Sequence, residues 1–394
     1  MVSGVNQINN AIVKAGSLID GSGHPIRVNV YLLVREGLIV SISGSVPAID
    51  LPLVDLSDKT LLPGLIDSHV HLSICSQTHG PDRSALFAAD YETIAPVIRR
   101  HVACHWRHGV VAVRDGGDAG AHVSRFARQH HNDDSPPLSI KSAGRAFYKP
   151  GRYGRIVGGQ PVDNSRLLDA IVRNMELADH IKLINSGINS LTVYGAQTEP
   201  QFQPDELRAI VRLARQNKRK VMVHANGVIP VREAVEAGVD SIEHGFFMGR
   251  DNLERMAERG VCWVPTAGTM QAFVRLGREG GAVAARNLES QLEQMAFARK
   301  AGVRIALGTD AGSPGVGHGD GVFTELALLL KAGYTMEQAV QCATANSADL
   351  CGFPRLGRLQ VGSPACFIAV RGTDKDILES PNRLQLFFPG HSGQ

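Results

Sequence analysis

The sequence predicts an α/β protein built on a (β/α)8 barrel, the TIM barrel. Short apolar strands alternate with longer amphipathic segments through the middle of the 394-residue chain, a pattern typical of βα units around a parallel sheet. Eight strands with their helices occupy roughly 290 residues there, which fits a barrel with insertions because about 250 residues are typical. A doubly wound open sheet stays open as the competing architecture, because a strand count does not exclude it.

The eight candidate strands lie at 61–71, 110–114, 139–145, 180–185, 220–225, 241–244, 262–266 and 303–309. Helical periodicity separates several of them, at 204–216, 231–237, 251–259 and 290–301. The two ends of the chain have a different pattern, with short strands rich in β-branched residues and turns between them. The strands and helices of the middle region therefore form the predicted barrel.

Composition limits the classes of function. A net charge of +3 is too small to indicate nucleic acid or a membrane surface as a partner. No apolar stretch is long enough to span a bilayer, and we see no signal peptide at the N-terminus. The cysteines form no CxxC pair, which favours a reducing compartment, here the cytoplasm; they are Cys75, Cys104, Cys262, Cys342, Cys351 and Cys366. We expect a small-molecule substrate, and homo-oligomerisation stays open.

Side chains of the kind that bind metals fall at the ends of the predicted strands. His69 and His71 are two residues apart, so both point to the same face of the first strand. An HxH pair alone is a weak pattern, and a lone histidine at a strand end is more often structural. All strand C-termini of a barrel converge on one rim, however, where barrel enzymes place catalysis. The residues that meet there are His69, His71, Lys182, His224, His244 and Asp310.

These motifs resemble the amidohydrolase superfamily. The resemblance rests on PGLIDSHVHL at 63–72, Lys182 on the fourth strand, VHANG at 223–227, SIEHG at 241–245 and GTDAG at 308–312. It extends over nearly the whole chain and is most similar to the Xaa-Pro dipeptidase and imidazolonepropionase-like group. It implies that residues 1–61 and 351–394 join in a small β-sandwich domain beside a barrel of residues 62–350.

The resemblance also implies two divalent metal ions, with zinc the first expectation. His69, His71 and Asp310 would hold one ion, and His224 and His244 the other. Lys182 would bridge the two as a carbamate. A carbamate fits there because an ammonium group would be repelled by two dications, whereas two carbamate oxygens can bridge them. Histidine and carboxylate ligands suit zinc, although Mn, Co, Ni and Fe(II) also accept such sites.

The expected reaction is hydrolysis of an amide or peptide-like C–N bond in a dipeptide, an N-acyl amino acid or a cyclic amide. A hydroxide that bridges the two metals would attack the carbonyl carbon. Asp310 would take up the proton and pass it to the leaving nitrogen. Asp67 and Glu243, next to predicted ligands in sequence, are expected either to orient the imidazoles or to serve as ordinary structural carboxylates.

Substrate-binding candidates lie in loops after the strands. The loop at 147–160 has a tyrosine- and arginine-rich sequence that would recognise a carboxylate or polarise a carbonyl, or is simply a solvated basic loop. A second tyrosine follows the fourth strand, and a histidine lies in the glycine-rich loop after the eighth. These candidates are Tyr148, Arg152, Tyr153, Arg155, Tyr194 and His318.

Two other classes of function stay open. The same centre serves metal-dependent esterases, lactonases and organophosphate hydrolases. An inactive binding or scaffold protein of this fold is the less favoured alternative, because such relatives usually lack several ligands and all six are present here.

Overall fold

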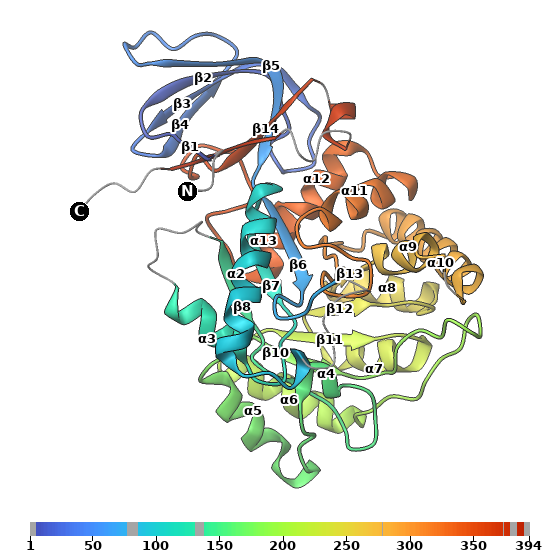
Figure 1. Ribbon diagram of the computed structural model, residues 1–394. Coiled ribbons are helices and arrows are strands. Elements are labelled where there is room, and N and C mark those ends of the chain that lie inside the picture. The colour runs from blue at the N-terminus through green and yellow to red at the C-terminus, as the bar shows by residue number, and fades with distance from the viewer. Residues whose placement is uncertain are drawn as a thin grey trace.

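The computed structural model describes residues 5–76, 86–130, 138–277, 279–372, 374–378 and 384–389. It is a mixed α/β fold with two visibly different parts (Figure 1). An all-β part contains strands from both ends of the chain. The larger part contains parallel strands with helices packed around them. In the described part of the chain, no helix combines the length and the apolar character that crossing a membrane requires.

The all-β part is one seven-stranded sheet in the order β1-β15-β14-β5-β2-β3-β4. Its strands are β1 Val5–Gln7, β2 Ala11–Leu18, β3 Arg27–Arg35, β4 Leu38–Ser43, β5 Leu53–Pro63, β14 Phe367–Arg371 and β15 Gln385–Phe388. Strand β14 pairs antiparallel with β5, and β15 pairs parallel with β1. The first and last segments of the chain therefore share backbone hydrogen bonds.

The sheet lies between two hydrophobic cores. Successive side chains of a strand point to opposite faces. On β14, Phe367 and Ala369 pack into the small core of the terminal strands, while Ile368 and Val370 pack into the large core of the α/β part. Burial on both faces explains why this strand is apolar without a break, and it attaches the sheet firmly to the rest of the molecule.

The parallel strands form two sheets in the order of the sequence, β6-β7-β8 and β9-β10-β11-β12-β13. Their bounds are β6 Leu65–Val70, β7 Val110–Asp115, β8 Ser139–Ser142, β9 Ala146–Phe147, β10 Ile181–Ile184, β11 Val221–Ala225, β12 Ser241–His244 and β13 Cys262–Val264. Of the third predicted strand, 139–145, only the first four residues form a strand, β8, and the short strand β9 begins just after the predicted end.

The eighth predicted strand, 303–309, makes only isolated bridges. Ala306 N donates to Trp263 O of β13 at 3.0 Å, and Ser68 N of β6 donates to Leu307 O at 2.8 Å. The Leu307 amide instead donates to Cys342 O, outside the sheet. The segment therefore joins the two sheets without forming a regular ladder.

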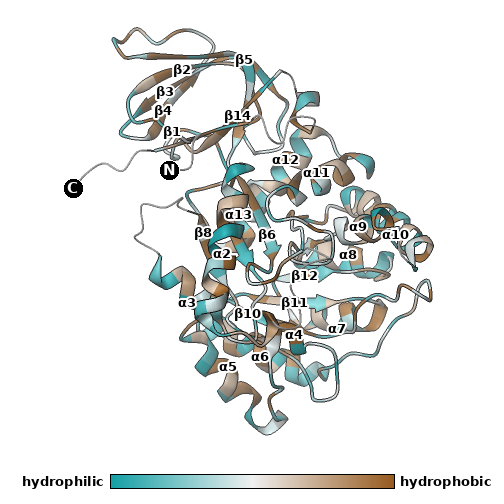
Figure 2. Cartoon of the chain, in the orientation of Figure 1, coloured by the Kyte–Doolittle hydropathy of each residue, from teal (hydrophilic) through white to brown (hydrophobic). Residues whose placement is uncertain are grey.

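The helices pack around these strands (Figure 1). They are α2 Tyr91–Arg107, α3 His122–Gln129, α4 Arg155–Gly158, α5 Leu167–Met175, α6 Pro204–Gln216, α7 Val228–Ala237, α8 Arg250–Arg259, α9 Gly268–Arg275, α10 Gly281–Ala301, α11 Gly321–Lys331, α12 Met336–Ala343 and α13 Ala345–Cys351. Apolar and polar residues alternate along them, as expected for helices with one buried face (Figure 2). Helix α6 begins and ends where the sequence predicts it, whereas α10 begins nine residues earlier, at Gly281 and not 290.

Candidate metal centre

The six predicted ligand side chains line one cavity at the C-terminal ends of the parallel strands. They are His69, His71, Lys182, His224, His244 and Asp310. The Asp310 Oδ1 atom lies 3.4 Å from His71 Nε2 and 3.6 Å from His69 Nε2. Donor atoms of these three residues all lie within 4.8 Å of one another, so they are close enough to share one ion.

The other two histidines extend this cluster. The ring centroids of His224 and His244 are 4.6 Å apart, and those of His69 and His244 are 5.0 Å apart. In the register of β11 with β12, His224 lies opposite Glu243 and Ala225 opposite His244, so the two histidines are one position apart on neighbouring strands. The cluster is therefore continuous from β6 to β12.

Each imidazole uses one ring nitrogen to fix its orientation. His69 Nδ1 donates to Glu243 Oε2 at 2.8 Å, His71 Nδ1 donates to Gly117 O at 3.2 Å, and His224 Nε2 donates to Gly187 O at 3.0 Å. His244 Nδ1 lies 2.6 Å from the hydroxyl of Thr266. These contacts leave the second nitrogen of each ring as a lone-pair donor, as a metal ligand requires.

Burial keeps these imidazoles neutral. It lowers the pKa of His71 to about 4 and that of His224 to about 3. The pKa values of His69 and His244 are also held well below their usual range, again chiefly by burial. Neutral imidazole is the form that binds metal ions, so the cavity holds its histidines in the competent protonation state at neutral pH.

Lys182 lies in the middle of this cluster. Its side chain is 1% exposed, and its Nζ atom makes no hydrogen bond to any described residue. Burial lowers the pKa of Lys182 to about 8, although the charges of Glu243 and Asp310 act in the opposite direction. A buried amine without a hydrogen-bond partner costs free energy unless another group completes its environment. Together with the free imidazole nitrogens and the carboxylate, this amine fits a site for divalent metal.

The backbone is strained where the strands end. His244 has a φ of 69°, Asp310 a φ of 58° and Thr266 a φ of 46°. Residues other than glycine rarely adopt this left-handed region, and a β-branched threonine there is a strong outlier. The strain lies at two predicted ligands and at the residue that contacts His244, which is typical of functional sites.

A charged network supports His69 from behind. Glu243 accepts from His69 and forms an ion pair with Arg114, with NH2 2.9 Å from Oε1. Arg114 also donates to Ser68 O at 2.7 Å, next to His69 in the chain. All of these side chains are buried. Glu243 therefore orients the imidazole of His69, which is one of the two roles that the sequence analysis expected for it.

Asp67 takes the other of the two roles expected for it, that of a structural carboxylate. Its carboxylate accepts from the backbone amides of His69 and Thr309 and from the Thr309 hydroxyl. It thus holds β6 against the segment that carries Asp310. Arg114 was missed as a supporting residue; the charged pair Arg114-Asp115 that ends the buried apolar strand β7 was the available signal.

Of the six substrate-binding candidates, Tyr153 lines the cavity. Its ring lies 5.5 Å from that of His224. Desolvation, with a contribution from the Asp310 charge, raises the pKa of Tyr153 to about 12, so its hydroxyl stays protonated. Arg152 and Arg155 are exposed and do not line the cavity, and the Arg152 guanidinium donates to Glu199 O at 2.6 Å.

The remaining candidates also lie outside the cavity lining. The buried Tyr148 donates its hydroxyl to Gly159 O at 2.6 Å. Tyr194 packs against Phe247, with the Arg286 guanidinium 3.9 Å above its ring. His318 is buried, and its Nε2 donates to Ile74 O at 2.9 Å. The loops around the site therefore bring one of the six candidates, Tyr153, to the cavity.

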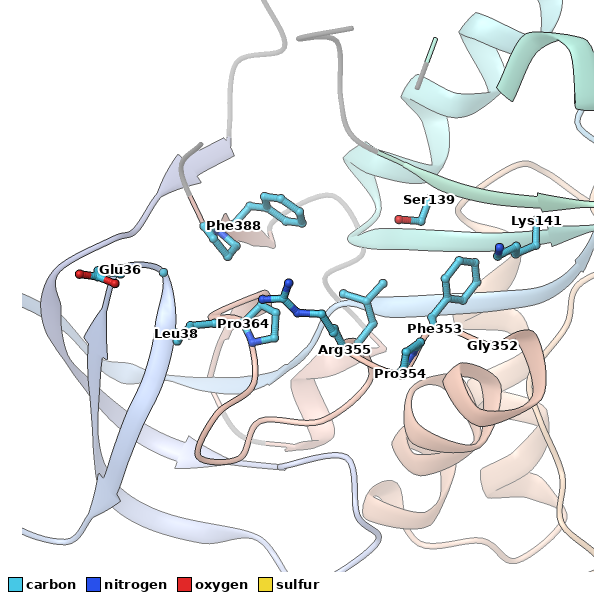
Figure 3. Close-up of a pocket in the computed structure, with 13 residues that line it drawn as sticks. Glu36, Leu38, Ser139, Lys141, Gly352, Phe353, Pro354, Arg355, Pro364 and Phe388 are labelled. Carbon is cyan, nitrogen blue, oxygen red and sulfur yellow. The ribbon is translucent and has the colours of Figure 1, made fainter. Parts of the chain in front are cut away.

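A second cavity, of about 630 Å³, lies where the terminal sheet meets β8 and residues 352–356 (Figure 3). Leu38, Pro364 and Phe388 line its terminal-sheet side, and Arg355 extends its guanidinium toward them. No histidine or cysteine is among the described residues that line it. Of these two cavities, the one at the strand ends, with a volume of about 570 Å³, carries the metal-type side chains.

The sequence of residues 60–388 matches the model of the amidohydrolase family. The chain belongs to this family. It is 27% identical to ochratoxinase of Aspergillus niger, over 94% of this chain and 83% of that protein. It is 24% identical to imidazolonepropionase of Mycolicibacterium smegmatis, over 96% of this chain and 92% of that protein.

Among solved structures, the amidohydrolase chain is similar to an Xaa-Pro dipeptidase with methionine bound in its active site. The TM-score is 0.82 at 28% identity, and the match covers 96% of this chain and all of the other. The family prediction is therefore confirmed, and the protein is a hydrolase of the amidohydrolase family.

Proposed function

We propose that this amidohydrolase cleaves an amide-like C–N bond at a centre of two divalent metal ions. The observation that carries the proposal is the buried cluster at the strand ends. Four imidazoles each keep one nitrogen unused, a carboxylate lies within reach of two of them, and the Lys182 amine has no hydrogen-bond partner among the described residues. Such convergent groups in one cavity are the usual mark of an active site.

His69, His71 and Asp310 would hold one ion, and His224 and His244 the other. Lys182, which lies between the two groups, would bridge the ions as a carbamate. Zinc is the metal that these ligands favour first. When bound, the ions supply Lewis-acid activation of a water molecule and of the substrate carbonyl.

Asp310 is the proposed acid–base residue. Its Oδ1 atom faces His69 and His71, while its Oδ2 atom accepts from the Ser313 hydroxyl at 2.8 Å. This hydrogen bond fixes the carboxylate plane, so that one oxygen can take up a proton and deliver it to the leaving nitrogen. Tyr153, with its protonated hydroxyl on the cavity wall, is the proposed donor to the carbonyl oxygen.

We further propose that the parallel strands form a closed (β/α)8 barrel. The hydrogen bonds of 303–311 to β13 on one side and to β6 on the other support closure at the eighth position. The consecutive strands β8 and β9 support continuity at the third. Residues 62–350 would form this barrel domain, and residues 1–61 and 351–394 the β-sandwich domain.

Metal analysis of protein purified without chelators tests the centre, followed by a screen of activity after loading with Zn, Mn or Co. We expect about two ions per chain and hydrolysis of amides such as dipeptides and N-acyl amino acids. The screen also contains lactones, esters and phosphotriesters. Turnover of these compounds alone would overturn the assignment of the scissile bond, and a lack of both metal and activity would overturn the site.

A further inference from the structure

The imidazole of His244 differs from the other three of the metal cluster in the group that holds it. Those three contact two backbone carbonyls and the Glu243 carboxylate, which is paired with Arg114, and all of these groups can only accept a hydrogen bond. His244 Nδ1 instead lies 2.6 Å from the Thr266 hydroxyl, and a hydroxyl can both donate and accept. Of the four, His244 is therefore the imidazole whose tautomer is left open by the chemistry of its partner.

The direction of this hydrogen bond decides whether His244 can bind a metal ion. If Nδ1 donates to Thr266, the single proton of the neutral ring is on Nδ1, and Nε2 keeps its lone pair. If the hydroxyl donates instead, the ring proton is on Nε2, and that nitrogen cannot bind a metal ion. The competence of His244 as a ligand thus depends on Thr266 acting as an acceptor.

Thr266 makes this contact from an unfavourable backbone conformation. Its φ of 46° lies in the left-handed region, which a β-branched residue rarely adopts, and the residue is fully buried. Its carbonyl accepts from the hydroxyl of Thr269 at 2.8 Å and from the Thr269 amide at 3.3 Å. A strained residue persists where its surroundings hold it in place, and such residues cluster at functional sites. The strain indicates that this position requires the hydroxyl, because glycine would adopt the same backbone conformation without steric cost.

A glutamine of helix α10 links the two strained strand ends. Gln291 is fully buried, and its Nε2 atom donates to His244 O at 2.6 Å and to Pro265 O at 3.1 Å. The first carbonyl belongs to the ligand residue, and the second belongs to the residue before Thr266. Trp263 Nε1 also donates to His244 O, at 2.9 Å. Gln291 thus connects the backbone of the ligand residue to the backbone of the residue that holds its ring.

Building on the proposed function, we infer that Thr266 and Gln291 are positioning residues for His244, and through it for the ion that His224 and His244 would hold. Thr266 accepts the Nδ1 proton, so Nε2 keeps the lone pair that a metal ion requires. Gln291 keeps the two strand ends at the separation that this hydrogen bond needs. Both residues act through the imidazole and not by contact with the substrate.

Three substitutions of Thr266 test the hydroxyl separately from the backbone. Thr266→Val keeps the β-branched shape but lacks the hydroxyl, Thr266→Gly lacks the hydroxyl and relieves the strained φ, and Thr266→Ser keeps the hydroxyl. In a zinc titration against a competing chelator dye, Thr266→Val and Thr266→Gly should bind one of the two ions about tenfold to a hundredfold more weakly. Thr266→Ser should bind both ions as the native protein does. Native affinity for both ions in Thr266→Val and Thr266→Gly would overturn the inference.

Thr344→Val is the matched control for Thr266→Val. Thr344 is also fully buried, and its hydroxyl donates to Val340 O at 2.6 Å. Both valine substitutions should lower the free energy of unfolding, but Thr344→Val should leave both zinc affinities unchanged. An equal loss of zinc affinity in the two variants would show that general destabilisation is the cause, and it would overturn the role given to Thr266.

Gln291→Leu tests the link between the strand ends. It should weaken binding of the same ion about tenfold, because the Thr266 hydroxyl is no longer held in place. The double variant with Thr266→Val should lose little more than Thr266→Val alone, since both changes act on one imidazole. Asn287→Leu is the control, because Asn287 lies one turn earlier on α10, is equally buried and donates to Ser190 O at 3.2 Å. Additive losses, or an equal loss in Asn287→Leu, would overturn the role given to Gln291.

Nitrogen-15 NMR of the metal-free protein separates this inference from the proposed function. The ring shifts show which nitrogen of a neutral histidine carries the proton, and the His244 signals are identified by their absence in His244→Gln. We expect the proton on Nδ1 in the native protein and a shift toward Nε2 in Thr266→Val. If the native protein bound no zinc, the proposed function would fail, while this NMR result would still support the inference on His244. The same tautomer in both proteins would overturn the inference, whatever metal is bound.

Discussion

His101, His105 and His318 form a second group of buried imidazoles, and they differ from the histidines of the metal cluster in what their ring nitrogens contact. His101 Nδ1 donates to Leu72 O at 2.8 Å, and His318 Nε2 donates to Ile74 O at 2.9 Å. His105 Nε2 lies 3.3 Å from His318 Nδ1, and the His101 and His318 rings stack at 3.8 Å.

Both groups are buried and both have lowered histidine pKa values, so neither property identifies a metal site. The two groups differ in the side chains that surround them. The metal cluster contains Asp310 and Lys182, and its free ring nitrogens face a cavity. In the described part of the chain, the second group forms no ion pair with a carboxylate, and it holds the backbone carbonyls that follow His71. The first group has the arrangement of the proposed metal centre, and the second supports the backbone that follows His71.

The largest effect is expected for Lys182→Ala. Loss of the proposed bridge should remove one metal ion per chain and lower kcat/KM by about a thousandfold or more, since a metal ion contributes several kcal/mol to the transition state. Acetate or propionate at high concentration should partly restore both, because a short carboxylate can replace the bridge. Metal analysis and kinetics check this. Full retention of both ions and of turnover would make Lys182 a structural core residue.

Glu243→Gln should weaken metal binding about tenfold to a hundredfold, because the residue that orients a ligand histidine loses its charge. Glu325→Gln is the matched control. Glu325 is equally buried, but burial raises its pKa to about 8, so it is protonated at neutral pH and glutamine resembles it. Titration with a metal-competing dye compares the two variants. Equal losses of metal affinity in the two variants would show that the effect does not depend on the contact between Glu243 and His69.

His318→Leu should affect stability and not metal content. The change leaves the carbonyl of Ile74 and the ring of His105 without their partner, which costs about 1–3 kcal/mol of unfolding free energy. Denaturant unfolding measures the cost, and elemental analysis should still find two ions per chain. Loss of one ion would show that the second histidine group belongs to the metal centre and is not a separate structural group.

Acid should destabilise the protein through the second group. Burial lowers the pKa of His101 to about 4 and that of His105 to about 3, below the unfolded value of about 6.5. The unfolded chain therefore binds protons that the folded chain does not. The stabilisation is complete above pH 6.5 and falls as the pH drops toward 4, by about 1 kcal/mol per pH unit for each histidine.

The variant His101→Gln should reduce that pH slope by about one histidine's share, whereas a change at the exposed His24 should leave it unaltered. Unfolding of the metal-free protein between pH 4 and 7 gives both slopes. An unchanged slope in His101→Gln would show that the second group does not bind protons on unfolding.

The sequence alone was sufficient to bring the proposed ligand side chains together. Residues two apart on a strand share a face, so His69 and His71 enter the cavity together. His224 and His244 could be placed because parallel strands end at one edge, and Lys182 because it lies on the strand between them and β9. Strand and helix periodicity are local properties of the sequence. The terminal strands and helix α6 were predictable because such local patterns determine them.

Only the tertiary structure decided which loop residues reach the cavity. His318 contacts the carbonyl of Ile74, 244 positions away, and Arg152 contacts that of Glu199, 47 positions away. The Arg114–Glu243 ion pair likewise joins two strands that are not neighbours in the sheets. Such contacts depend on how distant segments pack, because the tertiary fold determines which groups lie within hydrogen-bond distance of a loop side chain. Periodicity carries no information about that choice.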